Sequence, residues 1–65
     1  MNYRIDIWTW GFITDTYWNN NVESVLKWFK DNWAEKYENG LCTFRVYKDD
    51  VELSFEEEYR LGFHS

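Results

Sequence analysis

Residues 20–37 constrain the fold of this chain more than any other stretch, because their apolar members recur at helical spacing. Steps of three and four residues place these side chains on one stripe of an α-helix, about 120° wide. Asn20 can cap the start of the helix, with Glu23 three positions later completing a capping box. Asn39 and Gly40 tolerate the left-handed backbone that ends many helices. The stripe, which needs an apolar surface to cover, consists of Val22, Val25, Leu26, Phe29, Trp33 and Tyr37.

The N-terminal segment alternates as a strand does when one of its faces packs on a core. The helix-facing positions are Tyr3, Ile5, Ile7 and Thr9, and the opposite positions are Arg4, Asp6, Trp8 and Trp10. This pattern leaves Trp8 and Trp10 together on the sheet face turned away from the helix. Beyond Gly11, residues 12–18 are β-branched and aromatic, and they either continue the strand after a glycine bulge or fold back as a second strand.

A second alternating region follows the helix. Residues 42–47 and 51–56 alternate apolar and polar side chains on either side of Asp49-Asp50. A two-residue turn there predicts a hairpin, although Asp-Asp is a weaker turn signal than Asn-Gly and a longer loop stays open. The turn sets two apolar pairs opposite each other, Val46 with Leu53 and Phe44 with Phe55.

The alternation continues to the C-terminus through Tyr59, Leu61 and Phe63. A strand over residues 51–63 would be longer than most, so we expect a bend or break near residues 56–58. The last segment then pairs elsewhere or meets a second copy of the chain. Glu57 is the one charged residue on the apolar side of this strand, and we expect Glu57→Gln to affect stability or binding more than Glu58→Gln.

Taken together, these elements predict one small α+β domain over residues 1–65. One helix packs on one face of a mostly antiparallel sheet of three or four strands, in the order β(β)αββ. With 65 residues the core is modest, and five Trp, five Tyr and five Phe supply most of its volume.

The charge balance bears on partners. Twelve acidic residues against seven basic ones give a net charge of −5, which repels nucleic acid and anionic lipid and attracts a basic protein surface. A single cysteine is typical of a cytoplasmic protein rather than a disulfide-stapled one. No apolar run is long enough to span a bilayer and the N-terminus lacks signal-peptide features, so we expect an unprocessed cytoplasmic protein without a membrane partner.

Groups that could carry catalysis are sparse. His64 is expected to be a solvated residue near the chain end, and Cys42 a buried small hydrophobe. The acidic runs match no calcium-loop spacing, the three glycines are too dispersed for a phosphate loop, and no zinc-type Cys/His pairing exists. The sequence therefore predicts a protein that is not an enzyme and that needs no cofactor or metal.

Surface aromatics are the remaining candidates for a site. Trp, Tyr and Arg dominate binding energy at protein interfaces, and the open sheet face is rich in them. The alternative is that residues 12–18 or the C-terminal tail cover this face as a second small core. Trp28 lies off the helix stripe and either snorkels over a strand end or anchors a partner. The candidate partner-binding residues are Trp8, Trp10, Tyr47, Arg45, Glu52, Glu56, Glu57 and Trp28.

Three functions fit these features. The first is an inhibitor or adaptor that binds a protein, including mimicry of nucleic-acid phosphates by carboxylates. In size, acidity and lack of catalytic groups the chain resembles the small acidic proteins with which phages and mobile elements block host or defence proteins. The second is a homo-oligomeric structural or regulatory protein, for example a homodimer. The third is single-stranded nucleic-acid binding by aromatic stacking, which the net charge opposes.

Overall fold

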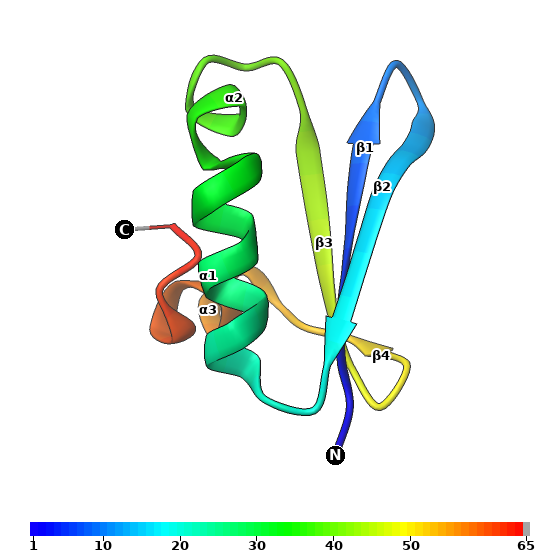
Figure 1. Cartoon of the computed structure of the whole chain (residues 1–65), viewed down its shortest axis with the longest axis vertical. Helices are drawn as coiled ribbons and strands as arrows, with labels where there is room; N and C mark the ends of the chain where they lie inside the picture. Colours follow the sequence, from blue (N-terminus) through cyan, green and yellow to red (C-terminus); the bar gives the residue numbers. More distant parts are fainter. Residues whose placement is uncertain (65) are drawn as a thin grey trace.

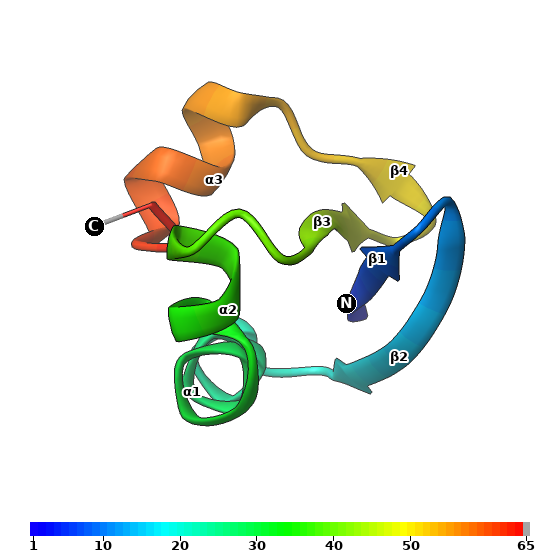
Figure 2. The same ribbon diagram turned by 90° about the horizontal axis from the view of Figure 1, so that it is seen from above.

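The computed structural model describes residues 1–64 and shows an α+β fold with helices on one side of a four-stranded sheet (Figures 1 and 2). The sheet is antiparallel throughout, in the order β2-β1-β3-β4. The elements in chain order are β1 Tyr3–Thr9, β2 Phe12–Asn19, α1 Val22–Asn32, α2 Ala34–Glu38, β3 Thr43–Lys48, β4 Val51–Glu52 and α3 Phe55–Leu61. The fold class expected from the sequence is confirmed, with two short helices added to the long one.

Residues 12–18 fold back, which settles the alternative left open by the sequence. β2 pairs with β1 through a two-residue turn at Trp10-Gly11, and the pairing places Tyr17 opposite Ile5. Both turn residues have positive φ, 55° and 81°, which is the type I′ geometry that matches the twist of hairpin strands. A bulge opposite Ile7/Trp8 shifts the register once along the hairpin.

The β3–β4 hairpin forms at the predicted turn. Asp49 and Asp50 both have positive φ, 50° and 67°, a conformation that short Asp side chains tolerate. Asn2 anchors this turn, because its backbone N–H donates to Asp49 Oδ1 at 2.9 Å and its carbonyl accepts from Asp49 N–H at 2.8 Å. Leu53 N–H donates to the Val46 carbonyl, so the first expected pair is present.

The core lies between the sheet and α1. Its centre is Phe29, whose ring centroid lies 4.5 Å from that of Phe44 on β3. The predicted helix stripe therefore covers the sheet face that the alternation assigned to it. The buried apolar side chains are Ile5, Ile7, Val25, Phe29, Cys42, Phe44, Val46, Leu53 and Phe63.

The long helix breaks at Trp33, where the sequence predicted a continuous helix. Trp33 has φ −132°, and its indole N–H donates to Asp15 Oδ2 on β2 at 3.1 Å. The helix break therefore coincides with a hydrogen bond that connects the helical segment to strand β2. At the other end the cap is Asn21 and not Asn20, since Asn21 Oδ1 accepts from Glu23 N–H at 2.9 Å.

The C-terminal strand expectation is wrong, because the segment after Leu53 becomes α3. Ser54 caps this helix in a capping box, in which Glu57 N–H donates to Ser54 Oγ and Ser54 N–H donates to Glu57 Oε1. Phe55 therefore does not pair with Phe44 as a strand residue. Helical spacing turns Glu58 inward and leaves Glu57 exposed. From this burial we expect Glu58→Gln, and not Glu57→Gln, to have the larger effect on stability.

His64 is not a solvated terminal residue. Its side chain is 10% exposed, Nε2 lies 2.8 Å from Glu58 Oε1, and its ring packs against Phe44 and Phe55. The backbone after α3 explains this position. Gly62 ends the helix at φ 99° and Phe63 N–H donates to the Glu58 carbonyl, which returns the chain to the core.

The capping box predicts a pH effect at Glu57. The backbone N–H of Ser54, followed by its hydroxyl, lowers the pKa of the Glu57 carboxyl. A pKa lower in the folded state contributes stability above the unfolded pKa and loses it as pH falls through the folded pKa. In urea unfolding, the free energy of unfolding of Glu57→Gln should therefore fall below that of the wild type at pH 7, and the difference should shrink as pH falls through the lowered pKa. A difference that does not change with pH would exclude a contribution from the carboxylate.

Candidate functional site

The sheet face turned away from the helices, here called the open face, is not covered by any part of residues 1–64. β2 extends the sheet at its edge, and the three helices lie together on the other side (Figure 2). The alternative of a second small core is therefore not observed. Strand pairing arranges the open face in three rows: Trp18, Arg4, Tyr47 and Glu52; Thr16, Asp6 and Arg45; Ile13, Trp8 and Thr43.

Two arginines lie over the aromatic rings of this face. The Arg4 guanidinium carbon is 4.2 Å from the Tyr47 ring centroid, and that of Arg45 is 5.1 Å from the Trp8 ring. Arg4 is also held by Asp6, whose Oδ1 lies 3.4 Å from Arg4 Nε. The open face therefore combines cations and aromatic rings, residue types that are enriched among the dominant contacts of protein interfaces.

Asp6 is buried at the centre of the open face. It is 5% exposed, and Thr16 Oγ1 donates to its Oδ1 at 3.1 Å in addition to the Arg4 contact. A buried polar group needs such hydrogen-bond partners. Asp6 therefore holds Arg4 in position on the face and is not itself available to a ligand.

One end of the molecule carries three strongly exposed apolar side chains, here called the tip. Trp10 is 95% exposed, Phe12 75% and Leu41 65%. Figure 1 shows the β1–β2 turn and the α2–β3 connection at this same end. Exposed aromatic residues that gather in this way on a small protein indicate an interaction site.

Of the three residues of the tip, Trp10 is the one whose presence is least accounted for by a contribution to folding. It occupies the first position of a type I′ turn at φ 55°, where Asn, Asp or Gly is strongly preferred. A bulky side chain at positive φ is strained by of order 1 kcal/mol or more. Since the indole is almost fully exposed, burial on folding does not offset this strain.

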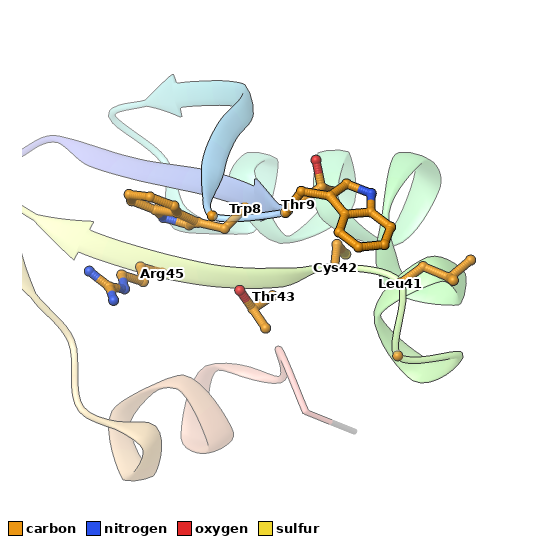
Figure 3. Close-up of a pocket in the computed structure, with 9 residues that line it drawn as sticks. Trp8, Thr9, Leu41, Cys42, Thr43 and Arg45 are labelled. Carbon is orange, nitrogen blue, oxygen red and sulfur yellow. The ribbon is translucent and has the colours of Figure 1, made fainter.

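A hollow lies between the tip and the open face. Figure 3 shows Trp8 and Arg45 side by side from neighbouring strands, with Thr43 and Leu41 further along β3 and its preceding loop. Trp8 Nε1 is buried without a hydrogen-bond partner among residues 1–64. The full lining is Trp8, Thr9, Trp10, Gly11, Gly40, Leu41, Cys42, Thr43 and Arg45, and it includes no acidic residue.

The structure brings part of the predicted site together. Trp8, Tyr47, Arg45 and Glu52 share the open face as expected, whereas Trp10 sits in the turn and not on the strand. The pattern of strand β1 missed this because a turn replaces its last expected residue.

Three predicted residues lie elsewhere. Trp28 stacks on Tyr17 with ring centroids 5.0 Å apart and an interplanar angle of 8°, which matches the packing alternative for this residue. Glu56 pairs with Arg60 along α3, and Glu57 belongs to the capping box. Because α3 packs on the helix side, neither carboxylate adjoins the open face.

The sequence patterns missed Trp18, Ile13 and Leu41. Trp18 is 63% exposed beside Arg4, and Ile13 is 51% exposed opposite Trp8. Both could be placed only after residues 12–18 were assigned to a strand paired with β1. Leu41 lies in a loop, where no periodicity marks a residue as exposed or buried.

Cys42 is buried as predicted, and its thiol is expected to react slowly. It is 6% exposed, and burial raises the pKa of the thiol, with the nearby Lys36 opposing this weakly. Since the thiolate is the reactive form and the thiol is both buried and raised in pKa, alkylation by iodoacetamide at pH 8 should be slower in the native protein than in 8 M urea. Equal rates in both conditions would show that Cys42 is accessible.

Other kinds of site receive no support from the described residues. Within residues 1–64 there is no group of three His, Cys, Asp or Glu side chains placed to hold a metal ion. None of the helices there is long and apolar enough to cross a membrane. Comparison with protein-family models, curated proteins and solved structures finds no match to this chain.

Proposed function

We propose that this chain is a non-catalytic protein-binding module, an inhibitor or adaptor of the small acidic type that phages and mobile elements use against host or defence proteins. The contact surface is the open face together with the tip. The observation that carries the proposal is Trp10, which is 95% exposed in a strained turn position. A residue whose turn strain is not offset by burial is accounted for by an interaction outside the chain.

Charges of both signs lie in two rows of the open face. Arg4 shares its row with Glu52 and also faces Asp50, and Arg45 shares its row with the buried Asp6. Of these acidic residues Glu52 is exposed at the β3–β4 end and is the carboxylate to which a basic partner group would dock. We place this encounter in the cytoplasm, where the free thiol of Cys42 stays reduced.

Ordinary docking is favoured over mimicry of nucleic-acid phosphates. Most of the carboxylates already bind groups within the molecule, which leaves few of them free to imitate a row of phosphates. The carboxylates engaged in this way are Asp6, Asp15, Asp31, Asp49, Asp50, Glu56, Glu57 and Glu58.

Homodimerisation is the second candidate, and the exposure of β2 favours it. β2 is an eight-residue edge strand with Phe12, Ile13 and Trp18 exposed. Two features limit pairing at this edge, namely the bulge near Thr14 and the inward Asp15, whose Oδ1 accepts from Thr16 N–H. Light scattering of the purified chain, combined with quenching of tryptophan fluorescence, separates the candidates. A dimer at micromolar concentration in which Trp18 is shielded from the quencher favours self-pairing, and a monomer favours a different partner.

The test of the proposed function is affinity capture from a host lysate with quantitative mass spectrometry. Wild-type chain, Trp10→Asn and Tyr59→Ala serve as baits; Tyr59 is 60% exposed on α3, far from the tip. We expect a protein retained by the wild type and Tyr59→Ala and reduced at least tenfold with Trp10→Asn. Retention of the same proteins by all three baits contradicts the proposal.

A further inference from the structure

We propose that the hollow between the tip and the open face binds a carboxylate of the protein partner, one carried next to a bulky apolar side chain. Arg45 and the indole N–H of Trp8 are the donors. This inference rests on the proposed function and specifies what the same surface recognises. It follows from three features of the hollow: its donors lack acceptors, its lining lacks acids, and its rim is apolar.

The donors of the hollow have no acceptors within residues 1–64. Of the three arginines, Arg4 faces Asp6 and Asp50 and Arg60 faces Glu56, while Arg45 is exposed and forms no ion pair in that part of the chain. Trp8 Nε1 is a buried N–H without a partner, an arrangement that native proteins mostly avoid. A buried N–H without a partner in residues 1–64, beside an exposed arginine without an ion pair there, is matched by an anionic acceptor.

The surroundings of the hollow favour an anion. Twelve of the 65 residues are acidic, yet none of them lines this hollow. Lys36 lines the neighbouring depression on the other side of Trp10 and Leu41. The hydroxyl of Thr43 adds a third polar group on the same strand as Arg45 (Figure 3). The lining of the hollow therefore carries a cation and no carboxylate, in a protein of net charge −5.

The rim of the hollow specifies what accompanies the carboxylate. Trp10 and Leu41 line it and are 95% and 65% exposed, so a bulky apolar side chain next to the acid would remove both from water. A phosphate chain fits less well, because further phosphates would meet the net negative charge of the protein. A protein segment with one carboxylate next to an apolar side chain would contact both the donors and the apolar rim of the hollow.

Arg45 can reach such a ligand without unfolding. It is exposed and lies over the Trp8 ring only through a cation–π contact, so turning toward the hollow breaks no ion pair within residues 1–64. Because the Arg45 guanidinium lies over the Trp8 ring, this movement changes the surroundings of the indole. The Trp8 N–H should therefore respond to a ligand that binds Arg45, which supplies a local spectroscopic signal.

The test is an NMR titration of the ¹⁵N-labelled full chain that follows the indole N–H of Trp8, assigned with Trp8→Phe. The probes are acetyl-Phe-Asp-amide, its uncharged analogue acetyl-Phe-Asn-amide, and inorganic phosphate. We expect saturable, millimolar binding of the Asp peptide with a downfield shift of the Trp8 signal, and at least tenfold weaker binding of the Asn peptide. Arg45→Gln should weaken binding of the Asp peptide about tenfold, whereas Arg60→Gln, which removes an arginine on α3, should leave it unchanged.

Three outcomes overturn the inference: equal binding of the two peptides, tighter binding of phosphate than of the Asp peptide, or equal loss in Arg45→Gln and Arg60→Gln. None of these outcomes changes whether capture of the partner depends on Trp10. Conversely, capture that is insensitive to Trp10→Asn removes the proposed function and leaves the titration result standing. The two failures are therefore distinguishable.

Discussion

Phe29→Ala is expected to lower the free energy of unfolding by about 3 to 5 kcal/mol. Phe29 is 1% exposed, and its ring lies 4.5 Å from Phe44, 5.9 Å from Phe63 and 6.2 Å from Tyr37, centroid to centroid. Removing it opens a cavity between α1, β3 and the segment that follows α3. The change can be measured by urea unfolding followed by far-UV circular dichroism.

A loss of that size approaches the whole stability of a domain this small, so two further variants are needed. Phe29→Leu keeps most of the volume and should cost about 1 to 1.5 kcal/mol while the protein still folds. Phe12→Ala, the same substitution at a 75% exposed position, should change stability by less than about 0.5 kcal/mol. Similar effects at residues 12 and 29 would contradict the assignment of the core.

Trp10→Asn is expected to have opposite effects on binding and on folding. Asn is a preferred first residue of a type I′ turn, so its introduction should relieve strain and stabilise the domain by about 0.5 to 1 kcal/mol. Loss of the exposed indole should weaken the partner complex about thirtyfold or more, the size of effect typical of an interface hot spot. Calorimetry with the partner identified by capture measures the second effect.

A smaller substitution separates turn strain from side-chain loss. Trp10→Gly removes the indole and also tolerates positive φ, so binding should fall as with Trp10→Asn. Leu41→Ala leaves the turn intact and removes only a neighbour of Trp10 in the tip, so a smaller loss of binding is expected. If Leu41→Ala abolishes binding while Trp10→Gly retains it, the anchor has been assigned to the wrong residue.

The helix and the first sheet strands could be predicted because their patterns depend on burial alone. The stripe through Val25 and Phe29 has no other use than covering a sheet, and the alternation through Ile5 and Ile7 fixes which sheet face the helix covers. The Asp49-Asp50 turn could be predicted for a similar reason, because a two-residue turn there places the apolar side chains of both strands on the same sheet face.

The C-terminal segment was misread because two periods fit it. Phe55, Tyr59 and Phe63 are spaced by four, which a helix explains as well as the alternation explains a strand. The capping pair Ser54 and Glu57 decides for the helix. The chain reverses after Gly62 at the end of this helix, and the reversal brings His64 next to Glu58. No periodicity in the sequence predicts this contact.

Part of the candidate site could be predicted from the alternation of side chains along the strands. Strand parity correctly gathered Trp8, Arg45 and Tyr47 on one face. Parity could not show that Trp10 leaves the strand for a turn, or that Leu41 comes beside it from another loop. Those two facts depend on tertiary structure, and they define the tip that we propose as part of the contact surface.

The most direct test of the account is the urea unfolding free energy of Trp10→Asn compared with the wild type, which needs no knowledge of the partner. If Trp10 serves an interaction and not the fold, the variant should be equally stable or more stable by up to about 1 kcal/mol, with an unchanged m-value. A loss of more than about 1 kcal/mol would show that Trp10 is part of the folded structure and would contradict the central claim.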